Sequence, residues 1–345
     1  MRIVLDAMGS DTCPVPDVDG AVQAARASGD TIILVGDQAA IERELAKYDT
    51  KGLSLEVVHA SQTVDMHDKP SQVARAKPDS SMMVGLMLVK NGKADAFVTA
   101  GNTGAALALA TLSTLRRVRG VKRPALTALI RLGQKTVVLT DLGANADAKP
   151  EWLVQFGEMA SIYAERVMGQ KNPTIGVLSN GEEEGKGNAL VKDTTLLFEQ
   201  SGLNFIGNIE PKDMLQGVAD VVVADGFVGN IALKSMESLA EVLFSLIRTE
   251  LTASLWMKIG AAIVYPALRR VYRQVDPFEI GGAPLLGVNG VVIIGHGRTN
   301  AKGIKNAIFQ AQRAVNGKFI EAIQSGMARF ADESHESHES HDAAE

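Results

Sequence analysis

Cysteine is almost absent from this chain of 345 residues, which contains only Cys13. A single cysteine excludes an internal disulfide and a cysteine-rich zinc site, and it suits a reducing cytoplasm. Export is not indicated, because the N-terminus enters a strand-like run at Ile3 to Leu5 without a long apolar segment and cleavage site behind a basic start. We therefore expect a cytoplasmic protein.

Positive charge is also in short supply. The chain has 35 Lys and Arg against 40 Asp and Glu, which gives a formal net charge of −5 at pH 7. This balance argues against a nucleic-acid surface as the main role. Apolar residues make up 46% of the chain, which at this length is enough for the core of one large domain or two smaller ones.

Three familiar motifs are missing. No Gly-x-Gly-x-x-Gly follows a strand, so a nicotinamide-dependent dehydrogenase is the least supported enzyme class, and no Gly-x-Ser-x-Gly elbow presents a nucleophilic serine. The glycine-rich stretch near Lys186 is not a Walker A loop, because Gly181 and Gly185 enclose three residues and Gly187 follows the lysine. A nucleoside triphosphatase is therefore a poor fit.

Charge is absent from one run, residues 96–115, which has about the length of a membrane span. The first third of this run contains Thr99, Asn102 and Thr103 together with two glycines. We therefore predict a short strand, a polar turn and a buried helix in place of a span.

Elsewhere, strand-like apolar runs alternate with helical patterns. Runs at 3–5, 31–35 and 53–58 are separated by helical patterns at 18–27 and 39–47. This alternation predicts a mostly parallel α/β sheet covered by helices on both faces. Ligands of such sheets bind at the carboxyl ends of the strands, so the turns that follow the strands are the first place to seek a site.

The turn at 179–188 has the features of an anion site. It follows a strand-like run at 173–178 and precedes a helical pattern at 190–200. Glycines let the backbone approach a ligand closely, the first N–H groups of a helix lack intrahelical partners, and Lys186 adds a cation. The alternative is a solvated turn, since three glutamates stand at 182–184.

Further polar turns follow strand-like runs at 99–104, 140–145, 225–230 and 295–298. One such turn is ordinary, because Asn and Gly tolerate left-handed backbone and Asp and Thr cap helices. Several at one sheet edge indicate a shared site for a small anion. His296, between two glycines, is either a general acid or base of that site or a structural histidine.

Two cations near the first turns have two interpretations. Arg75 and Lys77 lie in a short helical pattern after an irregular polar segment. They form either a solvated helix face or part of a cationic rim around the anion site.

Acidic residues are missing between Glu250 and Asp276, where apolar residues alternate with lysine and arginine. Breaks near Gly260 and Tyr265-Pro266 predict two short helices with an apolar tip. One interpretation is core packing or a homodimer interface. The other is interfacial insertion, in which the tip enters lipid headgroups and the arginines meet anionic lipids. The residues expected at the membrane are Leu255, Trp256, Ile259, Ile263 and Val264.

The end of the chain repeats Ser, His and Glu, without an apolar residue from 332 to 341. This composition predicts a disordered tail at 331–345. We expect no metal site, because a catalytic metal cannot be held by so flexible a segment.

Six segments carry a family resemblance: Asp6-Ala7-Met8-Gly9, residues 99–105, 141–145, 178–187, 225–230, and Gly287-Val288-Asn289-Gly290 through Gly297. Together they closely resemble the phosphate acyltransferase family of bacterial phospholipid synthesis, whose members make acyl phosphate from acyl-(acyl-carrier protein) and inorganic phosphate. The resemblance covers about residues 1–330 in the family's order. One departure is Ser10, where the family usually has a second glycine.

The resemblance implies a three-layer α/β/α sandwich related to the isocitrate and isopropylmalate dehydrogenases and to phosphotransacetylases. It further implies a single two-lobed domain over 1–330, a homodimer and peripheral attachment to the inner face of the cell membrane. It favours the insertion interpretation of the hydrophobic hairpin at about 250–275. The implied partners are acyl-carrier protein, inorganic phosphate, an anionic membrane surface and the membrane glycerol-3-phosphate acyltransferase that uses the product, without a cofactor or nucleic acid.

In this reaction phosphate would attack the thioester directly, so no protein nucleophile is required. Catalysis is then positioning plus electrostatic stabilisation of a tetrahedral oxyanion. We assign Lys186 to hold phosphate, with donors from Asn180, Asn102 and Thr103.

The acyl carbonyl is assigned to Asn230, with Asp225 or His296 orienting these groups. The other predicted substrate-binding residues are Gly104, Asn145, Gly181, Gly185, Gly229 and Arg75.

Two other function classes stay open. A short-chain phosphotransacetylase would use coenzyme A in place of a carrier protein, although the hydrophobic hairpin favours a lipid substrate. A non-catalytic phosphate- or nucleotide-binding module would bind a ligand without loss of the thioester.

Overall fold

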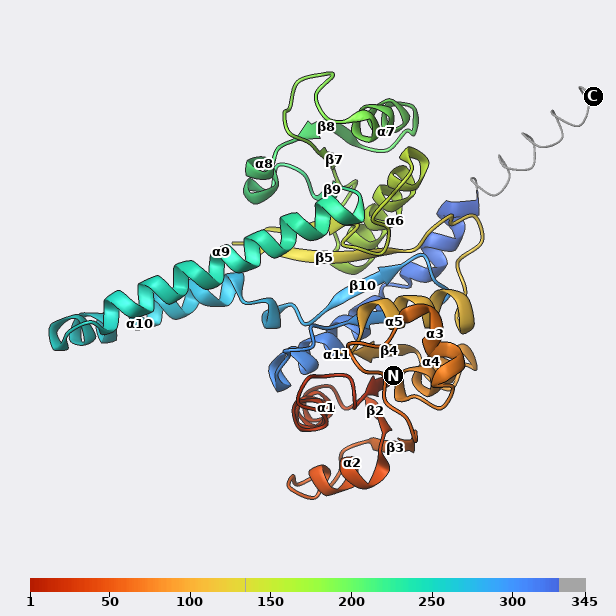
Figure 1. Cartoon of the computed structure of the whole chain (residues 1–345), viewed down its shortest axis with the longest axis vertical. Helices are drawn as coiled ribbons and strands as arrows, with labels where there is room; N and C mark the ends of the chain where they lie inside the picture. The colour runs from red at the N-terminus through yellow and green to blue at the C-terminus, as the bar shows by residue number, and fades with distance from the viewer. Residues whose placement is uncertain (134, 329–345) are drawn as a thin grey trace, which may run out of the picture.

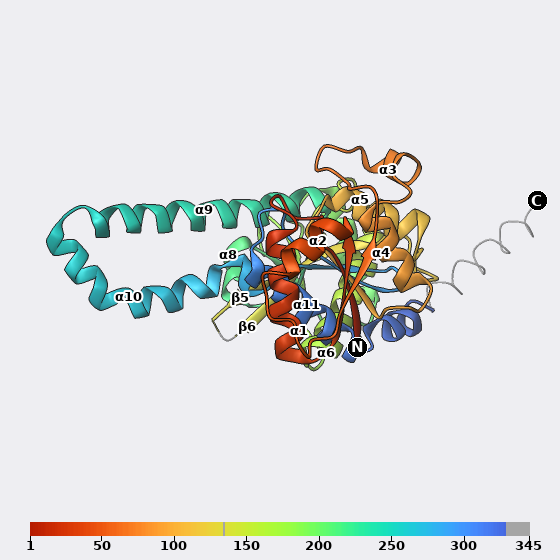
Figure 2. The ribbon, with the colours of Figure 1, turned by 90° about the horizontal axis from the view of Figure 1, so that it is seen from below.

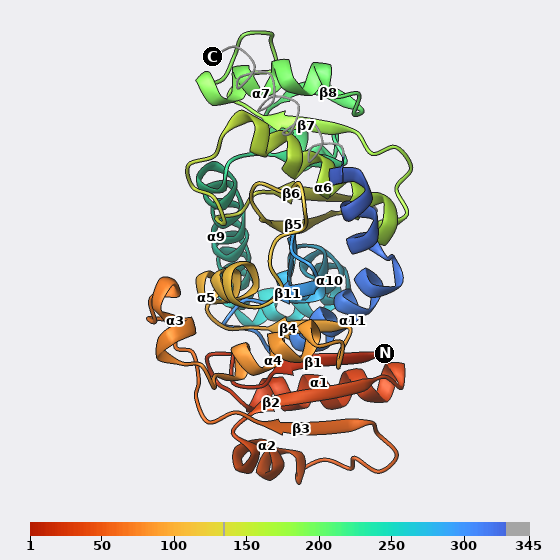
Figure 3. The same ribbon diagram turned by 90° about the vertical axis from the view of Figure 1, so that its right-hand side faces the viewer.

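The structure, a computed structural model, describes residues 1–133 and 135–328. Its centre is a sheet of eleven strands with helices on both faces (Figures 1 and 3). The expected three-layer α/β/α architecture is confirmed. The strands are β1 Arg2–Asp6, β2 Thr31–Gly36, β3 Leu55–His59, β4 Ala96–Thr99, β5 Ala125–Leu132, β6 Lys135–Thr140, β7 Ile175–Leu178, β8 Phe205–Ile209, β9 Val221–Val223, β10 Ala283–Leu286 and β11 Val291–Ile294.

The helices alternate with most of these strands. They are α1 Val15–Ser28, α2 Gln38–Leu45, α3 Pro70–Ala76, α4 Ser81–Lys90, α5 Thr103–Ala108, the π-helical turn η1 Leu109–Ser113, α6 Pro150–Met168, α7 Ala189–Gln200, α8 Pro211–Gln216, α9 Gly226–Thr252, α10 Leu255–Val275, the 3-10 turn η2 Pro277–Glu279 and α11 Ala301–Asn316. Helix α11 ends at Asn316, Lys318 adopts a positive φ of 49°, and helix resumes at 319–328.

Successive strand residues enter two separate cores. Ile3 and Leu5 of β1 belong to a core with α1, α6, α7 and α11, whereas Val4 belongs to a core with α4, α5 and α8. Because side chains of a strand alternate between the two faces of a sheet, this division gives the three layers. The continuous apolar runs of the sequence follow from burial of both faces.

The sheet order is β3-β2-β1-β4-β11-β10-β5-β6-β9-β7-β8. Pairing is parallel from β3 to β11 and from β6 to β8, but β10 and β5 run antiparallel to both of their neighbours. The two parallel blocks therefore run in opposite directions. The expectation that several polar turns share one sheet edge therefore holds for the turns after β4 and β11, whereas the turns after β6, β7 and β9 lie at the opposite edge.

The register nevertheless brings some of these turns together. Thr140 at the end of β6 pairs with Thr127 of β5. The neighbouring β5 residue, Leu126, pairs on the other side with Leu285 of β10. One residue before Leu285, Pro284 pairs with Ile293, near the end of β11. The end of β6 is thus level with the end of β11, so the turns after both strands can line one cleft.

Helices α9 and α10 form a long antiparallel hairpin that extends away from the sheet (Figures 1 and 2). The predicted bounds and break are corrected: the hairpin spans residues 226–275, and α10 continues through Gly260 and Pro266. A proline removes one donor, while packing along α9, with Phe244 and Tyr272 rings 5.1 Å apart edge to face, holds the helix together. Among the described residues, no helix has the length and apolar content needed to cross a bilayer.

A buried carboxyl lies beside the first strand-end turn. The Ser10 hydroxyl donates a hydrogen bond to Asp17 Oδ2 at 2.5 Å. The serine that stands where the family usually has glycine therefore has a hydrogen-bond partner in the structure. Asp17 Oδ1 accepts no hydrogen bond within the described residues. Burial, with a contribution from the Asp6 charge, raises the pKa of Asp17 from 3.8 to about 7.

We predict that this carboxyl makes folding pH-dependent. A raised folded-state pKa contributes stability that is complete below pH 3.8 and lost as the pH rises to about 7. In this window the free energy of unfolding of the wild type, relative to Asp17→Asn, should fall by about 1.4 kcal/mol per pH unit. Urea unfolding at two pH values measures this difference. Asp19→Asn, at a partly exposed position of the same helix, is the control, and an equal slope for both variants contradicts the assignment.

Candidate functional site

A cleft of about 810 Å³ lies between the turns after β4, β6 and β11 on one side and helix α9 on the other. Five of the predicted site residues line it: Asn102, Thr103, Gly104, Asn230 and His296. The rest of its wall is largely apolar and comes from β5, α9 and the segment from the end of α10 to β10. Concave, mostly apolar sites with a few convergent polar groups are typical of small-molecule binding.

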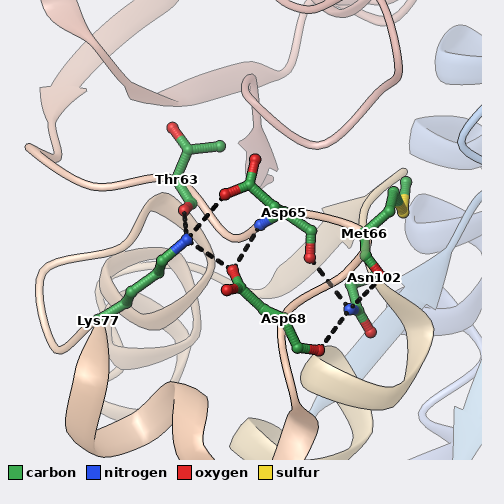
Figure 4. A network of polar contacts seen from close by, with 6 residues as sticks. All are labelled: Thr63, Asp65, Met66, Asp68, Lys77 and Asn102. Carbon is green, nitrogen blue, oxygen red and sulfur yellow. Dashed lines mark hydrogen bonds and ion pairs between the residues drawn. The ribbon is translucent and has the colours of Figure 1, made fainter.

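Asn102 holds two segments of the cleft wall together. Its Oδ1 accepts from the N–H of Ala105 at 3.0 Å and so caps α5. Its Nδ2 donates to the carbonyls of Asp65, Met66 and Asp68 at 3.1 to 3.2 Å (Figure 4). Met66 thereby becomes part of the cleft wall. The carboxamide is fully engaged with backbone, so its predicted donation to phosphate remains a prediction.

Lys77 anchors the same segment from the opposite side. Its Nζ donates to the Thr63 carbonyl at 2.7 Å and lies 3.0 Å from Asp65 and 2.6 Å from Asp68 (Figure 4). Lys77 is therefore neither on a solvated face nor free for an anion. Arg75, on α3, is exposed and makes no ion pair that the structure shows among the described residues. A role of Arg75 in binding remains a prediction.

Asp141 connects the cleft's two walls. Its fully buried carboxylate accepts from the N–H groups of Leu126 at 2.9 Å, Leu142 at 2.6 Å and Asn145 at 2.7 Å. Burial raises the pKa of Asp141, and these hydrogen bonds oppose that rise. Asn145 donates its Nδ2 to Asp141 and to the Pro124 carbonyl, so this predicted substrate-binding residue holds the turn in place.

The first turn of α9 lies against Asp141. A Cβ placed on Gly229 would come within 2.0 Å of the Asp141 carbonyl oxygen, so only glycine fits there. Asp225 caps the helix by accepting from Phe227 and Val228 N–H at 2.9 Å. These contacts place Asn230 in the cleft, close to Gly143. Asp225 itself lines a smaller hollow with Asn188.

The loop at 179–187 lies outside the cleft. The predicted strand, turn and helix are present as β7, the loop and α7. Asn180 Oδ1 accepts from Gly187 N–H at 2.9 Å, and Gly181 is buried against the Lys186 side chain. Gly185 has a positive φ of 84°, which the loop requires. Lys186 is exposed and does not line the cleft that contains Asn230.

Within the part of the chain that the structure describes, one of the three loop glutamates forms an ion pair. Glu182 lies 2.8 Å from Lys212 Nζ, which also lies 3.1 Å from Glu210. With Asp213 these carboxylates are close enough together to hold an ion. We assign no metal there, because Lys212 already forms ion pairs with two of the three groups.

Two charged residues of α9 that line the cleft were not predicted from the sequence. Glu237 and Lys234 follow Asn230 at spacings of seven and four, which place them on the same face of α9. Burial raises the pKa of Glu237, and the charges of His296 and Arg298 oppose it. His296 Nδ1 accepts from the Arg298 N–H at 3.2 Å. The helical spacing was the signal that could have identified this face.

We predict that Gly229→Ala destabilises the fold, because its methyl group would overlap the Asp141 carbonyl. Overpacking of this kind costs roughly 1–3 kcal/mol. Gly260→Ala is the matched control: a Cβ there meets nothing within 4 Å, and alanine inside a helix should stabilise by about 0.5–1 kcal/mol. Thermal unfolding compares the two variants, and equal melting temperatures contradict the close contact.

Comparisons with known proteins give matches along almost the whole chain. A family model described as "Fatty acid synthesis protein" matches residues 1–322. The phosphate acyltransferase of Dictyoglomus turgidum is 44% identical over 334 residues, which cover 96% of this chain and 99% of the relative. The phosphate acyltransferase of Geotalea uraniireducens is 48% identical over 329 residues, which cover 94% of each.

Solved structures support the fold alone. A phosphotransacetylase from Streptococcus pyogenes has a TM-score of 0.58 at 17% identity and covers 91% of this chain and 94% of its own. The EutD phosphotransacetylase from Staphylococcus aureus has a TM-score of 0.56 at 16% identity, with the same coverage. The expected relation to the phosphotransacetylase fold is confirmed. From the near-complete match to its relatives, the chain belongs to the phosphate acyltransferase family.

Proposed function

We propose that this protein is an acyltransferase that moves an acyl group from the thioester of acyl-carrier protein to inorganic phosphate. One observation carries the proposal: similarity above 40% identity to proteins named phosphate acyltransferase over nearly the whole chain. The cleft supports it, since polar turns and a long apolar wall share one cavity. Acyl phosphate produced in this way would supply the membrane glycerol-3-phosphate acyltransferase in phospholipid synthesis.

The chemistry needs no covalent enzyme intermediate. A phosphate oxygen attacks the thioester carbonyl carbon, the C–S bond breaks, and the carrier leaves as a thiolate that takes up a proton. The Asn230 carboxamide is the donor that we assign to the developing oxyanion, and the Thr103 hydroxyl is the donor that we assign to phosphate, because both residues line the cleft. His296 and the half-buried Glu237 would orient phosphate or move its proton.

Lys186 remains our candidate for phosphate binding. Its side chain is exposed on a glycine-rich loop ahead of α7, and Asn180 holds the loop through Gly187. A mobile exposed ammonium can attract and orient a phosphate dianion. Asp225, Asn145 and Gly229 act in this proposal by positioning Asn230 and not by touching substrate.

We predict that Lys186→Ala folds normally and loses most phosphate-dependent turnover, on the order of 100-fold. The measurement is release of free thiol from long-chain acyl-carrier protein with and without phosphate, followed by identification of acyl phosphate. Lys171→Ala is the control, because Lys171 is exposed at the opposite end of β7. Full turnover of Lys186→Ala at saturating phosphate removes this lysine from the mechanism, and phosphate-independent wild-type release contradicts the function.

A phosphotransacetylase acting on short-chain acyl-coenzyme A is the second candidate, because two solved structures that share the fold carry the name phosphotransacetylase. The same assay separates the two: a preference for acetyl-coenzyme A over long-chain acyl-carrier protein would favour this alternative.

The α9–α10 hairpin supports peripheral binding to the inner face of the cell membrane. The side chains of Leu255, Trp256 and Ile263 are 73%, 81% and 77% exposed. Clusters of exposed apolar side chains of this kind mark protein or membrane contact sites. Arginines at 269 and 270 lie on the same helix and can meet anionic lipid. Exposed apolar residues on α9, such as Leu239, support a homodimer in which two hairpins pack together.

We predict that the wild type floats with vesicles containing phosphatidylglycerol and that Trp256→Glu/Ile263→Glu does not. Two charges on the exposed tip remove its affinity for the interface. The control is Leu196→Glu, which alters an exposed leucine on α7. Equal flotation of both variants contradicts the membrane role. A loss of dimer mass on sedimentation, with flotation unchanged, would assign the tip to the homodimer alone.

A further inference from the structure

Part of the cleft is lined by apolar side chains that the catalytic chemistry does not use. Four β5 residues at alternate positions line one side, Leu126, Ala128, Ile130 and Leu132, and Leu233 and Ala240 of α9 line the other. Alternate residues of a strand share a face, and helix residues seven apart do too. We call this the β5–α9 channel.

Both walls start at the polar end of the cleft. Leu126 donates its N–H to Asp141, and Gly229, beside Asn230, packs against the carbonyl of the same residue. From there β5 and α9 lead toward the hairpin side of the molecule, where α10 contacts β5 (Figure 2). One end of the channel is therefore fixed next to the groups assigned to the acyl carbonyl.

The far end opens to solvent. Leu243, three residues beyond Ala240, is 49% exposed, and it lines the cleft as well. From Asn230 to Leu243 helix α9 advances by roughly 20 Å. From Leu126 to Leu132 strand β5 advances by a similar length, roughly 20 Å.

We propose that this channel binds the hydrocarbon chain of the acyl substrate, with its thioester end at Asn230 and its methyl end toward Leu132 and Leu243. This inference rests on the proposed function, and it further specifies the length of the acyl chain that the protein accepts. An extended chain with C–C bonds of about 1.5 Å advances by roughly 1.3 Å per carbon, so the channel accommodates roughly 15 carbons. A short acyl group would leave most of the apolar wall unused.

Charged residues also line this cavity: Arg131, Lys234, Glu237 and Asp276. Glu237 lies roughly 10 Å along α9 from Asn230, where the charge of His296 acts on it, and the side chain of Arg131 is exposed. Beyond Asn230, the other lining residues of β5 and α9 are apolar. Ala128 and Ala240 are the smallest side chains of the two walls, and each is partly buried. They leave the room that a chain would occupy, at different distances from Asn230.

The test places one substitution at two depths. Ala128 lies roughly 7 Å along β5 from Leu126, and Ala240 lies roughly 15 Å along α9 from Asn230. Phenylalanine at either position should block the channel beyond it. We expect Ala128→Phe to accept only short acyl groups and Ala240→Phe to accept intermediate ones, whereas the wild type prefers chains of about 14–16 carbons.

The readout is the ratio of kcat/KM for long and short acyl thioesters within each variant, over chains of about 4 to about 18 carbons. Each methylene group that is no longer buried against the apolar wall should lower kcat/KM roughly fourfold. The long-to-short ratio of kcat/KM should therefore fall at least tenfold for Ala128→Phe. Using a ratio removes effects of partial misfolding. Ala39→Phe, at an exposed position of α2, is the control.

Binding of a fluorescent long-chain fatty acid to the same variants gives a readout without turnover. Its affinity should fall most for Ala128→Phe, less for Ala240→Phe and not for Ala39→Phe. Graded binding without phosphate-dependent thiol release would support the channel and contradict the proposed function. Unchanged length ratios and unchanged fatty-acid affinity in Ala128→Phe would overturn the channel.

Discussion

The geometry of the cleft depends on one buried carboxylate, that of Asp141. A carboxylate removed from water is costly unless donors replace the lost hydration, and here backbone N–H groups from two segments do so. One of these donors, the N–H of Leu126, lies near the start of the apolar strand β5, and the carbonyl of Asp141 limits how close α9 can come at Gly229. Strand, turn and helix are thus fixed relative to one another by a single residue.

Much of the architecture could be predicted from local pattern. Buried strands read as continuous apolar runs, and the polar turns after them contain the residues that cap the following helices, as Asn102 and Asp225 do. The reversal at β10 and β5 could not be predicted, because strand direction depends on pairing between distant segments. The continuity of α10 through Pro266 was missed for a similar reason: packing along α9 offsets a local signal that ends helices.

The site was predicted in part. Asn102, Thr103, Asn230 and His296 do share one cleft, since their turns follow strands whose ends are level. The sequence did not separate residues that face the cleft from those that build it, because Asn and Asp serve both purposes with the same side-chain atoms. Asn145 is an example, because its side-chain Nδ2 donates to the Pro124 carbonyl and to Asp141 within the protein. Which face of α9 meets the cleft also required the fold.

Helix α9 is continuous from Gly226 to Thr252, so the cleft and the hairpin tip belong to one rod. From Asn230 to the end of the helix the rod measures roughly 33 Å, at 1.5 Å per residue. The length of this helix sets the distance between the cleft and the tip, and its number of residues sets the rotation of the tip about the helix axis. One inserted residue in its exposed half would turn everything beyond it by about 100° while leaving the cleft unchanged. The height of the cleft above any surface that the tip meets, and the face turned toward that surface, are therefore encoded in the length of one helix.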